Sequence, residues 1–217
     1  MANAVILPGE RLAGLQVDML QKLRSGHRNL DELDLFLQGK NPFTFERNEH
    51  GHIVLTLTGL NLTGAQEIER LETLDFRFDK YAKECLVSTN ADGYDAKHRL
   101  IAGQVYKVAL MPTKEIECDS DRTTANLRER GIKQYGYAKP LAGIVPRYRE
   151  KVSDKQMEEM GFRYIAAPHD TIKDTDGDPD LLCARRDGDG SWVNAFWDGP
   201  VYQWLDGGAF AFLVPAR

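Results

Sequence analysis

Residues 98–112, HRLIAGQVYKVALMP, contain the stretch that decides the fold. From Val105 to Met111 both alternating sets of side chains are largely apolar, which is typical of a strand covered on both faces. Gly103 interrupts the run before this strand, and Pro112 ends it because proline has no N–H to donate to a neighbouring strand. The pattern predicts a strand in the middle of a sheet. A buried helix segment is the alternative, but the short length and the β-branched residues argue against it.

The composition is that of a folded, globular protein. Of the 217 residues, 42% are hydrophobic and 28% are charged, which excludes a disordered or fibrous chain. The three cysteines are far apart and have no paired spacing, which favours reduced thiols over a disulfide framework or a zinc site. The sequence shows no secretion signal and no apolar run near the ~20 residues of a membrane span. We therefore expect a cytoplasmic protein without a membrane partner.

The N-terminal part of the chain predicts two amphipathic helices. Apolar residues recur at helical spacing over 10–24 and again from Leu30 to Leu37, and Asn29 is suited to cap the second helix. So short a connection predicts an αα-hairpin over residues 1–40, with a linker at Lys40–Phe45. A DNA-reading helix-turn-helix is an alternative. The second helix has three acidic residues and no basic one, however, and would repel phosphate.

Residues 46–217 have the pattern of one α+β domain. Alternating apolar residues predict strands over 52–58, 104–111, 162–167, 180–186, 191–197 and 208–214. Asp-Gly dipeptides between the C-terminal strands favour hairpins, so we expect a β-meander there. Thr63 and Ser153, each followed three residues later by glutamine, form capping boxes for short helices, and another helix is predicted over 123–130. Residues 74–88 are interpreted as partly extended, and the stretch after Gly131 as irregular.

The expected fold class is therefore α+β. An N-terminal helical hairpin precedes a mainly antiparallel sheet with a C-terminal β-meander and short flanking helices.

Several runs in the chain are similar to those of one group of proteins. They are residues 98–117, 120–140, 153–162, 174–182 and 192–198, together with LQKLRSG before the second helix. Their combination resembles a group of conserved hypothetical proteins from small-genome, uncultivated bacteria, and the resemblance covers most of the chain. It implies no activity, cofactor or catalytic residue, so the functional hypotheses rest on the residues themselves.

Charge is distributed unevenly along the chain, whose net charge is −5. Residues 122–151 hold eight basic and two acidic side chains, whereas residues 168–206 hold nine aspartates and three basic residues. The basic stretch also contains tyrosines, whose rings can stack on unpaired bases while basic groups neutralise phosphates. The candidate nucleic-acid-binding residues are Arg128, Arg130, Lys133, Tyr135, Tyr137, Lys139, Arg147 and Arg149. The alternative is a solvated face that pairs with the aspartates of the same chain.

Two further clusters contain residue types that bind metals. The candidate ligands of the first are His169, Asp174, Asp176 and Asp178. Alternate carboxylates around Gly177 suit a hard divalent cation, although their order is not that of an EF-hand, and a polar hairpin loop is the alternative. In the second, His50 and His52 point the same way from an extended chain, but a solvated turn is the more ordinary interpretation without a third ligand.

Three functional hypotheses follow from these patterns. The first is a non-enzymatic cytoplasmic binding protein that grips an anionic partner, such as RNA or single-stranded nucleic acid, through residues 122–151 and needs no cofactor. The second is a metal-dependent enzyme with a divalent metal near residues 169–180. The third is a protein–protein adaptor that acts through the N-terminal hairpin. The binding protein requires unpaired basic side chains on one surface. The enzyme requires a pocket where His169 meets two or more aspartates. The adaptor requires an exposed apolar stripe on residues 12–37.

Overall fold

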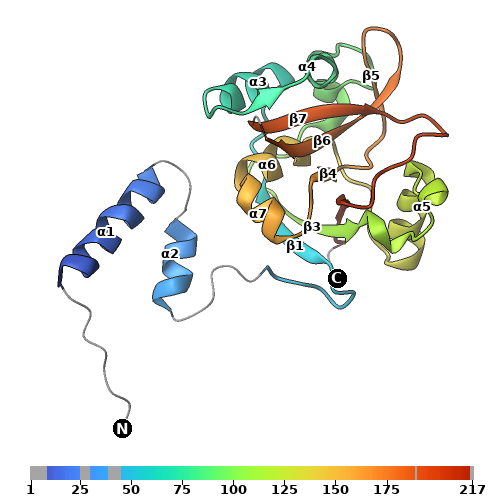
Figure 1. Ribbon diagram of the computed structural model, residues 1–217. Helices are drawn as coiled ribbons and strands as arrows, with labels where there is room; N and C mark the ends of the chain where they lie inside the picture. The colour runs from blue at the N-terminus through green and yellow to red at the C-terminus, as the bar shows by residue number, and fades with distance from the viewer. Residues whose placement is uncertain (1–8, 25–29, 39–44, 189, 216–217) are drawn as a thin grey trace. The chain divides into compact units, whose positions relative to one another are not determined.

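The computed structural model describes residues 9–24, 30–38, 45–188 and 190–215 (Figure 1). The chain divides into two compact units, Met1–Thr44 and Phe45–Arg217. The first unit contains α1 (Gly9–Arg24) and α2 (Leu30–Leu37), so both predicted N-terminal helices are present. The turn predicted between them lies outside the described residues, as does the predicted linker apart from Phe45.

The second unit combines helices with one sheet, which makes the fold α+β as expected. In chain order its elements are β1 (Ile53–Thr58), α3 (Gly64–Glu72), β2 (Arg77–Phe78), α4 (Lys80–Val87), η1 (Tyr94–His98), β3 (Val105–Pro112), η2 (Thr113–Glu115), η3 (Asp119–Asp121), α5 (Thr124–Glu129), η4 (Arg130–Gln134), α6 (Ile144–Lys151), α7 (Asp154–Glu159), β4 (Tyr164–Ala166), β5 (Ile172–Lys173), β6 (Pro179–Asp187), β7 (Gly190–Trp197) and β8 (Gly208–Leu213), where η marks a single helical turn of non-α geometry.

The predicted central strand is confirmed as β3. It pairs antiparallel with β1 on one side and with β8 on the other, and residues Val108 to Met111 are fully buried. The mostly antiparallel sheet runs in the order β1-β3-β8-β4-β6-β7-β2, with β5 paired to β6. Side chains on both faces of β3 therefore contribute to the core, as its two apolar sets require.

The predicted C-terminal meander is only partly correct. The strands β6 and β7 form an antiparallel hairpin at Asp187-Gly188, as the Asp-Gly signal indicates. The next strand, β8, does not continue beside β7. It crosses back and inserts between β3 and β4, pairing parallel with β4. The strand β8 thus joins the two halves of the sheet.

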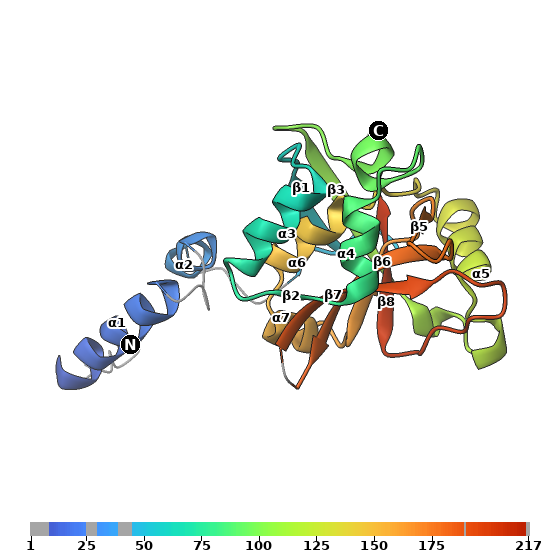
Figure 2. The same cartoon turned by 90° about the horizontal axis from the view of Figure 1, so that it is seen from above.

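Helices and loops cover both faces of this sheet. The helices α3, α4, α6 and α7 supply buried residues to a core on one face, and Leu71, Leu86 and Tyr148 belong to it. The helix α5 and the loops around Trp204 cover the opposite face, where Phe212 lies in a second core (Figure 2). The second unit therefore consists of three layers with the sheet in the middle.

Local sequence signals locate several helix starts correctly. Thr63 and Ser153 form the predicted capping boxes of α3 and α7, and Thr123 caps α5. Two predictions are wrong. Residues 74–88, expected to be partly extended, contain only the two-residue strand β2 and then form the helix α4, capped by Asp79. The stretch after Gly131, expected to be irregular, contains α6.

The helix α6 accommodates the proline that suggested a loop. Pro146 is its third residue, in the first turn, where a backbone N–H has no partner within the helix in any case. The helix packs its side chains inward, and both Arg147 and Arg149 are buried. Because these two arginines are buried, they cannot form part of a surface that binds an external anion.

Candidate functional site

The arginines of α6 are buried and paired within the protein. The Arg147 side chain is 4% exposed and forms ion pairs with Glu67 and with Glu150, the latter at 3.4 Å. The Arg149 side chain is fully buried and pairs with Asp154 at 2.5 Å. Neither guanidinium is presented to an external phosphate.

The other basic candidates also have internal partners. Arg128 donates to the carbonyl oxygens of Pro168 and His169, at 3.2 and 3.1 Å, and lies 3.4 Å from Asp198. Lys133 pairs with Glu129 at 2.6 Å, and Lys139 pairs with Asp170 at 2.6 Å. These pairs correct the expectation of unpaired basic side chains on one surface, because each basic candidate has an acidic partner within the chain.

The histidine pair that contains His52 and the basic, tyrosine-containing stretch nevertheless meet around Glu115, which was not among the predicted site residues. Its carboxylate accepts hydrogen bonds from His52 Nε2 at 2.5 Å, from the Tyr135 hydroxyl at 2.6 Å and from Arg130 Nε at 3.0 Å. The turn η2 carries Glu115, η4 and its C-terminal end carry Arg130 and Tyr135, and His52 directly precedes β1. We call these residues the Glu115 cluster.

A second line of hydrogen bonds continues from His52 into the protein. Since a carboxylate only accepts, Nε2 of His52 carries a proton toward Glu115, and Nδ1 lies within hydrogen-bond distance of the Tyr137 hydroxyl at 2.7 Å. Asn48 Nδ2 in turn donates to Tyr137 at 2.5 Å. The ring of Tyr137 stacks on Phe212 of β8, so this relay is fixed to the sheet.

Hydrogen bonding and burial shift the pKa values of the two ends of the relay. Burial alone would raise the pKa of Glu115, but the hydrogen bonds from His52, Tyr135 and Arg130 outweigh it and lower that pKa to about 2. Burial raises the pKa of Tyr137 to about 12. Near neutral pH, Glu115 is therefore a carboxylate and Tyr137 a phenol.

The relay has the form of an acid–base site, but it is closed to solvent. His52 is 3% exposed and Tyr137 is 5% exposed. The accessible part is the rim, where His50 is exposed and its ring lies 4.8 Å from that of half-buried Tyr135. Arg130 lies beside them with 31% of its side chain exposed. This geometry can bind a flat or anionic group more readily than it can exchange a proton with a substrate.

The predicted metal ligands do not converge. His169 is fully buried, where Nε2 accepts from the Leu182 N–H at 2.9 Å and Nδ1 donates to the Asp170 carbonyl at 2.6 Å. Asp174 closes a turn by accepting from the N–H groups of Asp176 and Asp178, each at 2.9 Å.

The expectation of a metal site near residues 169–180 is corrected accordingly. The side chains of Asp176 and Asp178 are exposed, and the segment forms a polar turn between β5 and β6. Within the described part of the chain, no three His, Cys, Asp or Glu side chains are grouped to hold a metal ion.

An apolar surface is exposed on the first unit. Leu15, Val17 and Leu20 of α1 are 53%, 55% and 50% exposed, and Leu30 and Leu37 of α2 are both 72% exposed. Among the residues of α1 and α2 whose exposure is described, none is buried. Leu15 belongs to the predicted apolar stripe of α1, whereas Met19 and Leu23 of that stripe are half-buried. The adaptor hypothesis therefore stays a prediction.

Glu115 and Asn48 are the site residues that sequence reasoning missed. Glu115 lies in the run KEIECDSD, which has the composition of a solvated surface, and its partners are 15 to 63 positions away in sequence. No local pattern reports such pairing.

Comparisons with known proteins add no relative. Neither a protein-family model, nor a curated protein, nor a solved structure matches the chain. In the described ranges, no helix combines the length and the apolar character that crossing a membrane requires.

Proposed function

We propose that this chain is a non-enzymatic protein–protein adaptor that associates through α1 and α2. The observation that supports the proposal is the exposure of five large apolar side chains on these two helices, each at 50% or more. Exposed apolar side chains that gather on one element mark interaction sites, whereas scattered ones need no explanation.

The first unit also lacks the means to be stable without a covering surface. The helix α2 has eight residues, and helices shorter than ~12–15 residues are marginal in water by themselves. Amphipathic helices gain most of their stability by packing an apolar face against another surface. With no buried residue among those described, α1 and α2 gain little of that stability from each other.

The partner that we infer is a second copy of this chain. The sequence of α2 has three acidic residues and no basic one, whereas the last turn of α1 contains Lys22 and Arg24. The apolar side chains of one copy can therefore pack against those of the other. The basic end of α1 in each copy can lie beside the acidic α2 of the other. A two-fold arrangement makes each such contact twice.

Sedimentation equilibrium of the full chain tests this proposal. We expect the average mass to rise from monomer to dimer between nanomolar and high micromolar concentration. Burying one leucine contributes about 1.5–3 kcal/mol, so Leu37→Asp, which acts in both copies, should raise the dissociation constant by about 100-fold or more.

A matched control is available in the second unit. Val201 is 73% exposed, as Leu37 is at 72%, so Val201→Asp makes a similar change on another surface. It should leave association unchanged. A wild-type chain that stays monomeric throughout, or equal weakening by both variants, would contradict association through α1 and α2.

A second candidate function is recognition of single-stranded nucleic acid at the rim of the Glu115 cluster. The supporting observation is the tilted His50–Tyr135 ring pair beside the partly exposed Arg130. Stacking of one base on an aromatic side chain is worth about 1–3 kcal/mol. With most cations paired internally, the salt dependence of binding should be shallow.

Fluorescence anisotropy of a labelled oligouridylate measures this second activity. Tyr135→Ala should weaken binding by about tenfold or more, whereas Tyr81→Ala, which removes a tyrosine that is 44% exposed elsewhere, should not change it. The absence of binding at low salt would remove this candidate.

A further inference from the structure

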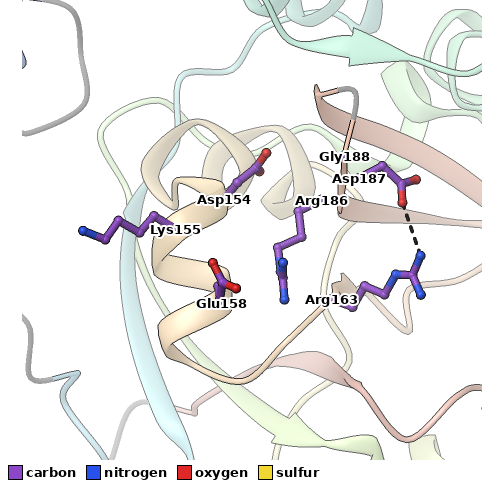
Figure 3. Close-up of a pocket in the computed structure, with 7 residues that line it drawn as sticks. All are labelled: Asp154, Lys155, Glu158, Arg163, Arg186, Asp187 and Gly188. Carbon is purple, nitrogen blue, oxygen red and sulfur yellow. Dashed lines mark hydrogen bonds and ion pairs between the residues drawn. The ribbon is translucent and has the colours of Figure 1, made fainter.

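A cavity of about 430 Å³ lies in the second unit beside α7 and the end of the β6–β7 hairpin. Its charged lining residues are Asp154, Lys155, Glu158, Arg163, Arg186 and Asp187 (Figure 3). The volume lies within the range of about 300–1,000 Å³ that is usual for small-molecule sites. Among the lining residues that the structure describes, acidic and basic side chains are equal in number, so a ligand of large net charge gains nothing from them.

Arg186 is held in place so that its terminal nitrogens are available. Its Nε donates to the Phe162 carbonyl at 2.9 Å, and its backbone N–H donates to the Arg163 carbonyl at 3.1 Å. No hydrogen bond or ion pair engages the two terminal nitrogens within the described residues. Figure 3 shows the side chain projecting from β6 into the space between Glu158 and Arg163. A guanidinium fixed in this way is prepared to bind a carboxylate through two parallel hydrogen bonds.

Glu158 provides the opposite charge in the same cavity. It projects from α7 on the side toward Arg186, and no ion pair joins the two side chains (Figure 3). In the part of the chain that the structure describes, the Glu158 carboxylate has no hydrogen-bond partner. It is therefore available to accept hydrogen bonds from an ammonium group.

The remaining charges of the lining are largely neutralised by neighbours. Asp154 pairs with Arg149 at 2.5 Å. Asp187 pairs with Arg185 at 2.9 Å and with Arg163 at 3.5 Å. Lys155 lies 4.0 Å from its neighbour on the helix, Glu159. Of the described lining residues, this leaves the guanidinium end of Arg186 and the carboxylate of Glu158 to face the cavity.

We propose that this cavity binds a small zwitterion, with the ligand's carboxylate on Arg186 and its ammonium group on Glu158. A dipolar ligand of this kind satisfies both unpaired groups and preserves the charge balance of the lining. A simple anion would satisfy Arg186 only and would meet the Glu158 carboxylate. The chemical class is that of an amino acid whose amine and carboxylate are separated by a short chain.

Titration calorimetry of the full chain with a matched ligand series tests the proposal. The zwitterions are ω-amino acids from β-alanine to 6-aminohexanoate, and butyrate and butylammonium supply each charge alone. At least one zwitterion should bind about tenfold or more tightly than either singly charged compound, because it makes one additional charge-assisted contact.

Two substitutions distinguish the two ends of the ligand. Glu158 is exposed, so Glu158→Gln leaves the fold intact. It should weaken the best zwitterion by about tenfold and should not weaken butyrate, because it removes a carboxylate that repels the anion. Arg186→Gln should weaken the zwitterion and butyrate alike. Arg163→Gln, at a side chain that is 59% exposed and already paired with Asp187, is the control and should have a smaller effect.

Two results would overturn the proposal. One is that no member of the series binds at millimolar concentration. The other is that Glu158→Gln and Arg186→Gln bind the zwitterion as the wild type does. Because the ligand series is independent of α1 and α2, either result leaves the association proposal untouched.

Discussion

His169 shows how strongly burial controls a single side chain in this protein. Its ring is completely buried, both nitrogens are bonded to the backbone, and the ring of His98 lies 5.1 Å away. Burial, reinforced by His98, lowers the pKa of His169 to about 3. The Nε2 atom of His98 is buried and has no hydrogen-bond partner among the described residues, and burial lowers the pKa of that ring as well. The Asp170 carboxylate favours a charge on either ring, but burial outweighs its attraction.

We expect the contribution of His169 to the free energy of unfolding to fall as the medium becomes acidic. Below its unfolded pKa of about 6.5, His169 binds a proton in the unfolded chain but not in the native state. Each unit by which the pH falls therefore lowers the free energy of unfolding by up to about 1.4 kcal/mol. His169→Gln should flatten this slope between pH of about 6.5 and 4.5 in urea denaturation, whereas His50→Gln, at an exposed ring, should not. An unchanged slope in His169→Gln would contradict the assignment.

Asp180 has the opposite dependence on pH. Burial, helped by the carboxylates of Asp174 and Asp79, raises the pKa of Asp180 to about 7. The native state therefore holds a proton that the unfolded chain releases near pH of about 4, and the associated stability is lost as the pH rises toward 7.

Asp180→Asn should consequently stabilise the protein above neutral pH. The amide removes a charge that is expensive to bury, and we expect a gain of about 1–2 kcal/mol at pH of about 8 that shrinks on acidification. The control is Asp176→Asn, because Asp176 is exposed in the neighbouring turn. A loss of stability in Asp180→Asn at pH of about 8 would show that the carboxylate is needed.

At the scale of elements, the helix α6 depends on a buried ion pair with α3. Arg147 and Glu67 are 4% and 3% exposed, and they face each other between the two helices. Burial raises the pKa of Glu67 in spite of the attraction of Arg147. Such pairs are costly to break on one side and often nearly neutral to replace as a whole.

Urea denaturation of a double-mutant cycle would measure this coupling. Arg147→Met should destabilise the second unit by up to about 3 kcal/mol, because buried Glu67 then keeps only the longer contact with Arg70 at 3.6 Å. The double variant Arg147→Met/Glu67→Leu should recover much of that loss, since apolar groups then replace both charges. Additive losses in the double variant would exclude the coupling.

The sequence predicts those elements whose signals are local. The Thr63 and Ser153 capping boxes, the apolar alternation of β3 and the Asp187-Gly188 turn each specify their own few residues correctly. The helix α6 escapes prediction because its buried face carries arginines, which a periodicity argument assigns to solvent. The helix α4 is hidden for a related reason, since its buried residues are mixed with charged ones.

The candidate sites also differ in whether local sequence patterns or long-range contacts determine them. The apolar spacing of leucines alone predicts the helices α1 and α2. The pairing of the basic residues in 122–151 is not predicted in this way, because Arg147 meets Glu67 and Lys139 meets Asp170 only after distant elements have packed together. A charge count along the sequence therefore suggests a phosphate-binding surface that folding removes.

At the scale of the whole molecule, the second unit is complete in its core. Every buried residue among those described belongs to Phe45–Arg217. A chain that begins at Phe45 should therefore keep the near-ultraviolet circular dichroism of the full protein. Its free energy of unfolding in urea should agree with that of the full protein within about 0.5 kcal/mol. It should also remain monomeric, which ties association to the first unit. Loss of the folded signal in this shortened chain would contradict the division into two units.

The position of β8 has a consequence for how the protein is made. This strand is synthesised after all others, yet it lies between β3 and β4 and is the seam of the sheet. Until β8 has left the ribosome, the nascent chain holds two half-sheets whose inner edges, β3 and β4, offer unpaired backbone groups to any passing strand. Native folding of the second unit is thus postponed until β8 has left the ribosome, and the hazard of that interval is aggregation of nascent chains through the edges that β8 later occupies.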